Sequence, residues 1–203
     1  TVFLYRKRTI WLLIFLSLLI LLSATFLWEK YRSLSGSSFI VYNIRGKSLC
    51  DFITGGKSIL VGNTSSLKDP YFVETFMKTR QNRNLTGLFQ FENLHSYRFA
   101  RPFYYKHYFY KAKGFIIFGN KKIMIIDNKI PDHLNVRIPL DYLIVSGNVR
   151  VTIKKILKCF KPGMIILDSS NPRWKALELM EEAKYTCVPC YDVSLSGGYS
   201  VKY

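Results

Sequence analysis

Acidic residues are scarce in this sequence. Its 203 residues include 13 Asp and Glu against 30 Lys and Arg, which gives a formal net charge of +17. This imbalance does not exclude an ordinary neutral cytosolic enzyme, but it makes that class less favoured. A positive excess of this size points to a polyanionic partner, either nucleic acid or an anionic membrane surface.

Glycine, proline and cysteine are also few. The 12 Gly and 7 Pro exclude a collagen-like or linker-like chain. Four Cys in a chain of this length do not make a disulfide-dense secreted scaffold. Intrinsic disorder is excluded because 49% of the residues are hydrophobic. The chain is therefore long and apolar enough for one domain with its own core.

One long stretch lacks charge altogether. No charged residue occurs from Thr9 to Trp28, a stretch made mostly of Leu, Ile, Phe and Trp. About 20 helical residues cross a hydrocarbon core of ~30 Å, so residues 9–28 predict a transmembrane helix with the lipid bilayer as its partner. A cleaved signal peptide is less favoured, because Phe26-Leu27-Trp28-Glu29 is a poor cleavage site.

The flanking charges predict the orientation of this helix. Three cations precede it, whereas it is followed by Glu29, Lys30 and Arg32. The positive-inside rule therefore favours a cytoplasmic N-terminus, with the soluble part on the other side of the membrane. Because residue 1 is Thr, we expect a fragment of a longer protein. We expect three parts: the helix and its flanks (1–32), a Ser/Gly linker (33–38) and one domain (39–203).

The first half of this domain has strand patterns. Three strands are expected, with a hairpin turn at Gly55-Gly56, and a helix follows that Asp69 caps and Pro70 begins. A long β-like stretch then continues from about residue 84 to 126. The three strands are expected at residues 39–44, 48–53 and 57–61, and the helix at 68–81.

The last third alternates between short apolar runs and helical spacing. Such alternation predicts a β-α-β-α-β unit, and with the hairpins it predicts a mixed α/β domain with layered sheets and flanking helices. The second helix is expected to start after an Asn171 cap. The expected elements are strands 142–145, 164–167, 191–193 and 200–203, with helices 151–160 and 172–184.

Few residues have a spacing typical of a metal-binding site or of a nucleophilic catalytic site. His95, His107 and His133 have no metal-binding spacing, and each is expected to be a surface or hydrogen-bonded histidine. Cys187 and Cys190 form a lone CxxC motif without the second ligand pair that a structural zinc site needs. The sequence therefore predicts no metal site, no cofactor and no catalytic residues.

The segment Asp168-Ser169-Ser170-Asn171 follows a predicted buried strand and precedes a helix. Polar residues at this position often carry function in open α/β sheets. The same residue types are also favoured at any helix N-terminus, so both interpretations stay open.

The clearest sign of a ligand is the segment from Tyr97 to Lys113, in which cations alternate with aromatic residues. Phosphates attract Lys and Arg, and unpaired bases stack on rings. The alternative is a β-ribbon with its rings in the core and its basic residues on an exposed face. The predicted nucleic-acid-binding residues are Arg98, Arg101, Lys106, Lys111 and Lys113.

Several motifs resemble, in order, those of ComEC-type competence proteins, the inner-membrane channels of DNA uptake. The resemblance covers residues 10–203 and is closest to the divergent form found in Bacteroidetes. It is most specific at Phe160-Lys161-Pro162-Gly163 and at the segment from Ile165 to Asn171 that leads to Trp174-Lys175. Further similar stretches are Val41–Ser48, Asp51–Val61, Leu140–Asn148 and Ser196–Tyr199.

The resemblance implies a metallo-β-lactamase-like domain in a channel for DNA uptake, with DNA and the rest of the competence channel as partners. The family's HxHxDH cluster is missing here, and the late "HHGS"-like loop is replaced by Ser146-Gly147-Asn148. We therefore expect a degenerate, non-catalytic domain that guides DNA by its basic surface. One alternative is a nuclease that degrades the non-transported strand with atypical metal ligands such as His95, Asp127 and His133. The other is a structural module packed on the channel or on anionic lipid.

Overall fold

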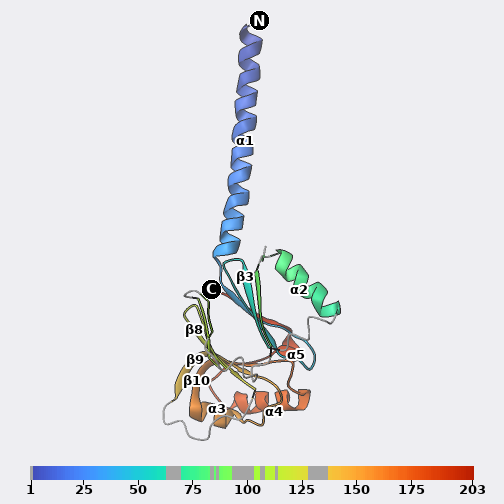
Figure 1. Cartoon of the computed structure of the whole chain (residues 1–203), viewed down its shortest axis with the longest axis vertical. Coiled ribbons are helices and arrows are strands. Elements are labelled where there is room, and N and C mark those ends of the chain that lie inside the picture. Colours follow the sequence, from blue (N-terminus) through green and yellow to red (C-terminus); the bar gives the residue numbers. More distant parts are fainter. Residues whose placement is uncertain are drawn as a thin grey trace.

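The structure is a computed structural model, and it describes residues 2–62, 70–82, 85, 87–92, 103–105, 108–112, 114–127 and 137–203. A long helix, α1, projects from one end of a layered α/β domain, and the helices α3 and α4 lie at the opposite end (Figure 1). Two sheets form the middle of the domain. The predicted mixed α/β class with an N-terminal apolar helix is confirmed.

Helix α1 (Val2–Ser35) contains the predicted apolar span. Its segment Ile10–Glu29 is long and apolar enough to cross a membrane, and none of it is buried against the rest of the described chain. Side chains such as Trp11 and Trp28 are exposed. Such exposure is unfavourable in water and favourable in lipid. The helix also continues through residues 33–35, where a linker was expected, because extending an existing helix needs no new nucleus.

The first sheet is built from the predicted hairpins. Strands β1 (Ser38–Val41), β2 (Leu49–Thr54) and β3 (Lys57–Gly62) are antiparallel neighbours. Gly55 and Gly56 have φ of +56° and +72°, as a tight two-residue hairpin turn requires. The strand order is β12-β1-β2-β3-β4.

Two further strands complete this sheet. Helix α2 (Pro70–Asn82) connects β3 to its parallel neighbour β4 (Gly87–Glu92), and β12 (Tyr199–Lys202) pairs with β1. Pro70 begins α2 as predicted, whereas the expected cap Asp69 lies outside the described residues.

The second sheet joins a meander to the predicted β-α-β-α-β unit. Its order is β11-β10-β9-β8-β7-β6-β5, with antiparallel pairing from β5 to β8 and parallel pairing from β8 to β11. Helices α3 (Ile153–Cys159) and α4 (Arg173–Lys184) lie in the two crossovers. The strands are β5 (Phe103–Tyr105), β6 (Phe109–Ala112), β7 (Phe115–Phe118), β8 (Lys121–Ile126), β9 (Ile138–Val145), β10 (Phe160–Leu167) and β11 (Cys190–Asp192).

Three apolar clusters separate four layers in the order α, β, β, α. The middle cluster joins the facing sheets, with Phe52 of the first sheet in edge contact with Phe118 of the second at 5.3 Å between ring centroids. An outer cluster packs α3 and α4 on the second sheet. The other outer cluster packs Phe76 of α2 on the first sheet. Strands β1 and β2 are buried on both faces, whereas β5, β6 and β7 of the meander alternate between less and more exposed residues.

One local prediction was wrong, and one predicted strand is present with ends that differ by one residue. Asn171 does not cap α4, whose N-cap is Pro172 and receives no side-chain hydrogen bond. The Asn171 amide instead donates to the backbone oxygen of Val145 at 2.7 Å, a carbonyl at the end of β9 that also accepts from the Asp168 N–H at 3.2 Å. The strand expected at residues 191–193 ends at Asp192, whose carboxylate accepts from the Ser194 N–H at 2.8 Å and caps the short helix α5 (Val193–Ser196).

Candidate functional site

A polar loop follows β10 at the edge where the parallel strands end. We call residues 168–171 the Asp168 loop. Asp168 is 1% exposed, and its Oδ1 accepts hydrogen bonds from the Ser170 hydroxyl, the Ser170 N–H at 3.0 Å and the Asn171 amide at 3.2 Å. Three donors on one carboxylate oxygen hold the loop in a single conformation.

The loop is also bonded to the turn that follows β9. The Gly147 N–H donates to the Ser170 hydroxyl oxygen at 2.6 Å, and the Ser146 and Ser170 hydroxyls lie 3.2 Å apart. Gly147 and Asn148 have φ of +69° and +55°, a left-handed pair that Gly and Asn tolerate better than other residues. The Gly147 N–H, the Ser170 hydroxyl and the Asp168 carboxylate thus form one chain of hydrogen bonds.

Ser169 connects the same loop to the first sheet. Its hydroxyl donates to the Asn43 side-chain oxygen at 2.9 Å, and its backbone oxygen accepts from the Gly46 N–H at 2.9 Å. Asn43 and Gly46 lie in the β1–β2 connection. The Asp168 loop therefore ties together both sheets at one edge of the domain.

Burial raises the pKa of the Asp168 carboxyl above its ordinary value of 3.8, although the hydroxyls of Ser170, Ser48 and Ser146 act in the opposite direction. Its second oxygen, Oδ2, is buried and receives no hydrogen bond of normal geometry from any described residue. Burial also raises the pKa of the Cys50 thiol, with a further contribution from the charge of Asp168. A buried thiol with a raised pKa is a poor nucleophile.

The residues at this edge do not fit a dinuclear metal centre. The Asp168 loop and the β9 turn offer one carboxylate, with serine hydroxyls and amide groups, whereas zinc prefers His and Cys with carboxylates. Asp127, which follows β8, does lie here, since a Cβ on Gly147 would be 3.9 Å from its Cβ. Within the described ranges, no three His, Cys, Asp or Glu residues gather closely enough to hold a metal ion. His95, His107 and His133 lie outside the described residues.

Only one of the five predicted nucleic-acid-binding residues can be placed. Lys111 is 2% exposed, on the same face of β6 as the core residue Phe109, so the expectation of an exposed position was wrong for it. Burial lowers the pKa of its ammonium group, and the negative charge of Asp127 acts to raise it. The alternation of β6 turns Lys111 inward with the phenylalanine. Arg98, Arg101, Lys106 and Lys113 lie outside the described residues.

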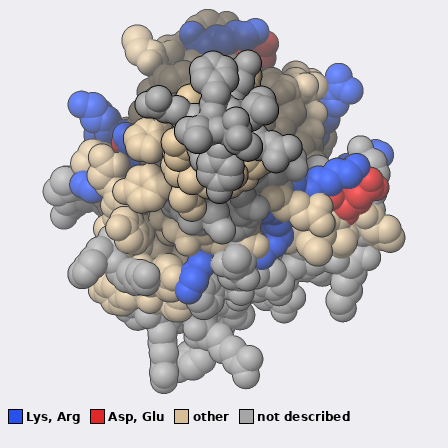
Figure 2. All heavy atoms as spheres, turned by 90° about the horizontal axis from the view of Figure 1, so that it is seen from above, with Lys and Arg blue, Asp and Glu red and all other residues tan. Residues whose placement is uncertain are grey.

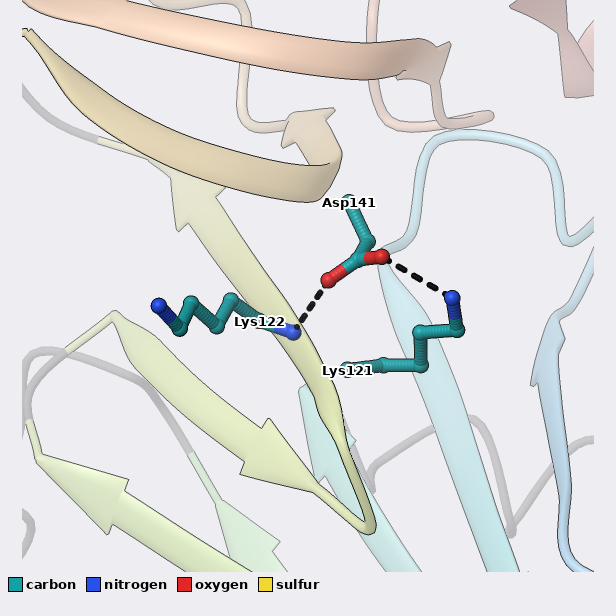
Figure 3. A network of polar contacts seen from close by, with 3 residues as sticks. All are labelled: Lys121, Lys122 and Asp141. Carbon is teal, nitrogen blue, oxygen red and sulfur yellow. Dashed lines mark hydrogen bonds and ion pairs between the residues drawn. The ribbon is translucent and has the colours of Figure 1, made fainter.

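A second polar network lies at the other end of β8 (Figure 3). The Asp141 carboxylate accepts from the Lys121 ammonium at 3.0 Å and from the Lys122 N–H at 2.9 Å. Partial burial acts to raise the pKa of Asp141, but these hydrogen bonds and the lysine charges outweigh it and lower that pKa. The hydrogen bond to Asp141 is the main cause that raises the pKa of Lys121. This network fastens β8 to β9.

Cys190 of the CxxC motif has the environment of an inert thiol. Cys187 is exposed and Cys190 is half-buried at the start of β11. Burial, with the nearby charge of Asp192, raises the pKa of Cys190 to about 12. Reactive cysteines need the opposite shift.

A cationic groove beside α3 is absent from the sequence-based predictions. The signal for it was the composition of α3 itself, Ile-Lys-Lys-Ile-Leu-Lys-Cys, which carries three lysines and no acidic residue.

The fold and its polar edge thus define a two-sheet α/β domain on an apolar helix, and a comparison with protein families identifies it. The family model of the ComEC C-terminal domain matches residues 39–203, so the chain belongs to this family. This membership is consistent with a protein of competence and DNA uptake. Searches of curated proteins and of solved structures found no significant match.

Proposed function

We propose that this chain is a membrane-anchored, non-catalytic domain of a DNA-uptake channel, and that it guides DNA by positive charge. The observation that carries the proposal is the family match over residues 39–203. The net charge of +17 supports a polyanionic ligand. The α, β, β, α layering supports a degenerate metallo-β-lactamase-like fold, which is part of the same proposal.

The chemistry of the Asp168 loop supports the non-catalytic part of the proposal. Its one buried carboxylate already accepts three hydrogen bonds at Oδ1, and the neighbouring groups are hydroxyls and amides. Such a cluster fixes a loop and bridges two sheets. It supplies neither the ligand set of a dinuclear hydrolase nor an imidazole base.

The charge around the membrane helix supports an outer, periplasmic position for the domain in a bacterial inner membrane. Basic residues concentrate before the apolar span, at Arg6, Lys7 and Arg8.

On the face from which α1 projects, the described Lys and Arg side chains are spread around the rim between uncharged side chains and form no continuous patch (Figure 2). The described cations on this face therefore do not by themselves form a DNA-binding patch.

The test uses the full chain in lipid nanodiscs with a fluorescent single-stranded oligonucleotide. We expect binding at low salt, an intact oligonucleotide after incubation with Zn²⁺ or Mn²⁺, and no stoichiometric metal in the purified protein. Absence of binding at low salt would refute DNA guidance. Cleavage with stoichiometric metal would instead support the nuclease alternative, one of whose suggested ligands, Asp127, lies near Gly147.

A further inference from the structure

A groove with a volume of about 760 Å³ lies between the start of α3 and the end of α4. Its cationic lining comes from Lys154 and Lys158 of α3 and from Arg137, which directly precedes β9. All three side chains are exposed. None of them makes an ion pair with a residue that the structure describes.

The spacing of the two lysines concentrates charge on one side of the groove. Residues four apart lie on the same face of a helix, so Lys154 and Lys158 repel each other unless an anion lies between them. The one acidic residue in the lining, Glu182, is already engaged, because its Oε2 accepts from the Ile153 N–H at 2.6 Å. The groove therefore offers positive charge that its own carboxylate does not neutralise through an ion pair.

The rest of the lining consists of apolar side chains, two threonines and one aromatic ring. Leu157 is half-buried, and Tyr185, directly after α4, is 89% exposed. The backbone that carries this ring is fixed, since the Tyr185 N–H donates to the Glu182 oxygen at 3.3 Å and the Thr186 N–H to the Ala183 oxygen at 2.9 Å. An exposed ring on a fixed backbone beside exposed cations is the combination that binds unpaired bases and their phosphates.

The position of the groove argues against lipid as its occupant. Helices α3 and α4 lie at the end of the domain opposite α1 (Figure 1). When the apolar span of α1 is in a bilayer, the groove faces away from that bilayer. Duplex DNA fits less well, because its base faces are stacked and cannot meet Tyr185.

We infer that the groove lined by Lys154, Lys158 and Tyr185 binds single-stranded nucleic acid. This inference rests on the proposed function and assigns it a site. The two lysines and Arg137 contact phosphates, and the Tyr185 ring stacks on a base. The site lies on the second sheet's helical layer and includes none of the residues between Tyr97 and Lys113.

The test measures binding of a fluorescent oligo-dT by the full chain in nanodiscs, with variants matched in charge. Lys154→Gln with Lys158→Gln removes two groove cations, and Arg45→Gln with Lys202→Gln removes two exposed cations of the first sheet. We expect the groove pair to weaken binding about tenfold and to reduce the slope of log K against log salt by about 0.7 for each phosphate that is no longer neutralised. The control pair is expected to have a much smaller effect.

The aromatic contact has its own control. Tyr185→Ala is expected to weaken binding, Tyr185→Phe to retain it, and Trp174→Ala, which removes an exposed ring at the other end of α4, to leave it unchanged. Equal losses in the groove and control pairs would overturn the groove assignment while leaving DNA guidance intact. The groove assignment would also be overturned if the groove variants lost binding to anionic vesicles but kept their binding to oligo-dT. Wild-type protein that fails to bind oligo-dT would refute the proposed function itself.

Discussion

The Ser170 hydroxyl donates a hydrogen bond to the Asp168 carboxylate and accepts one from the Gly147 N–H at 2.6 Å. One hydroxyl thereby joins the ends of the parallel strands β9 and β10. Ser169, the next residue, joins the same loop to the first sheet through Asn43. The edge at which the resemblance would place a metal centre is here a structural junction of the two sheets.

Removing this hydroxyl should destabilise the domain. Ser170→Ala leaves the Gly147 N–H without its acceptor, and we expect a loss of about 1 kcal/mol in the free energy of unfolding. Urea unfolding of the full chain in detergent, followed by circular dichroism, measures it. Ser200→Ala on the exposed side of β12 is the control and should change little. A Ser170→Ala variant as stable as this control would show that the junction contributes nothing.

Asp168→Asn tests the cost of the buried charge. The raised pKa means that folded protein keeps this proton at a pH where unfolded chain has lost it, so ionisation costs stability as the pH rises above about 3.8. The asparagine oxygen still accepts from Ser170 and Asn171. We therefore expect the variant to gain stability relative to wild type between pH 4 and pH 7.5, by about 1.4 kcal/mol for each unit of the raised pKa. A difference that shrinks with rising pH would contradict this account.

Asp141→Asn should show the opposite pH dependence. The lowered pKa of Asp141 means that its ionised form stabilises the folded state, and this contribution is present above about pH 3.8 and lost as the pH falls below it. We expect the variant to be less stable than wild type at pH 7 and to approach it in acid. The measurement is the same unfolding series. A gap that persists unchanged at pH 3 would mean that the lysine contacts in Figure 3 do not act through the charge.

Gly62 tests how closely the strands β2 and β3 must approach each other. A Cβ at this position would lie 2.3 Å from the Ser48 backbone oxygen, and φ is +132°. Gly62→Ala should therefore cost several kcal/mol, of the order of strong overpacking. Gly46→Ala, with φ of +70° and open space around it, should cost only about 1–2 kcal/mol. Thermal unfolding of both variants checks the ranking, and equal melting temperatures would contradict it.

Much of the fold could be predicted because the local signals agreed with one another. The Gly55-Gly56 turn fixed the register of its hairpin, and the apolar runs at residues 142–145 and 164–167 marked parallel strands buried on both faces. These strands begin earlier than predicted, at Ile138 and Phe160, because polar residues such as Asp141 are accommodated through partners on neighbouring strands.

The candidate site was harder to predict. In Tyr97–Lys113 nearly every residue is aromatic or basic, so the sequence pattern does not show which side chains face the core. Lys111 shares the buried face of Phe109. Asn171 has the residue type of a helix cap, but its partner, the Val145 oxygen, is 26 residues away in sequence. The groove at Tyr185 depends on two helices that meet only in the folded domain, so the three lysines of α3 are not enough to predict it.

The most direct test of the central claim, that this domain holds DNA by charge, is the salt dependence of oligo-dT affinity. The full chain in nanodiscs is titrated by fluorescence anisotropy between about 50 and 300 mM salt. We predict a straight line of log K against log salt with a slope of about −0.7 for each phosphate neutralised, and therefore a total of about −2 if the three groove cations each contact one phosphate. Affinity independent of salt, or no binding at the lowest salt concentration, would contradict the account.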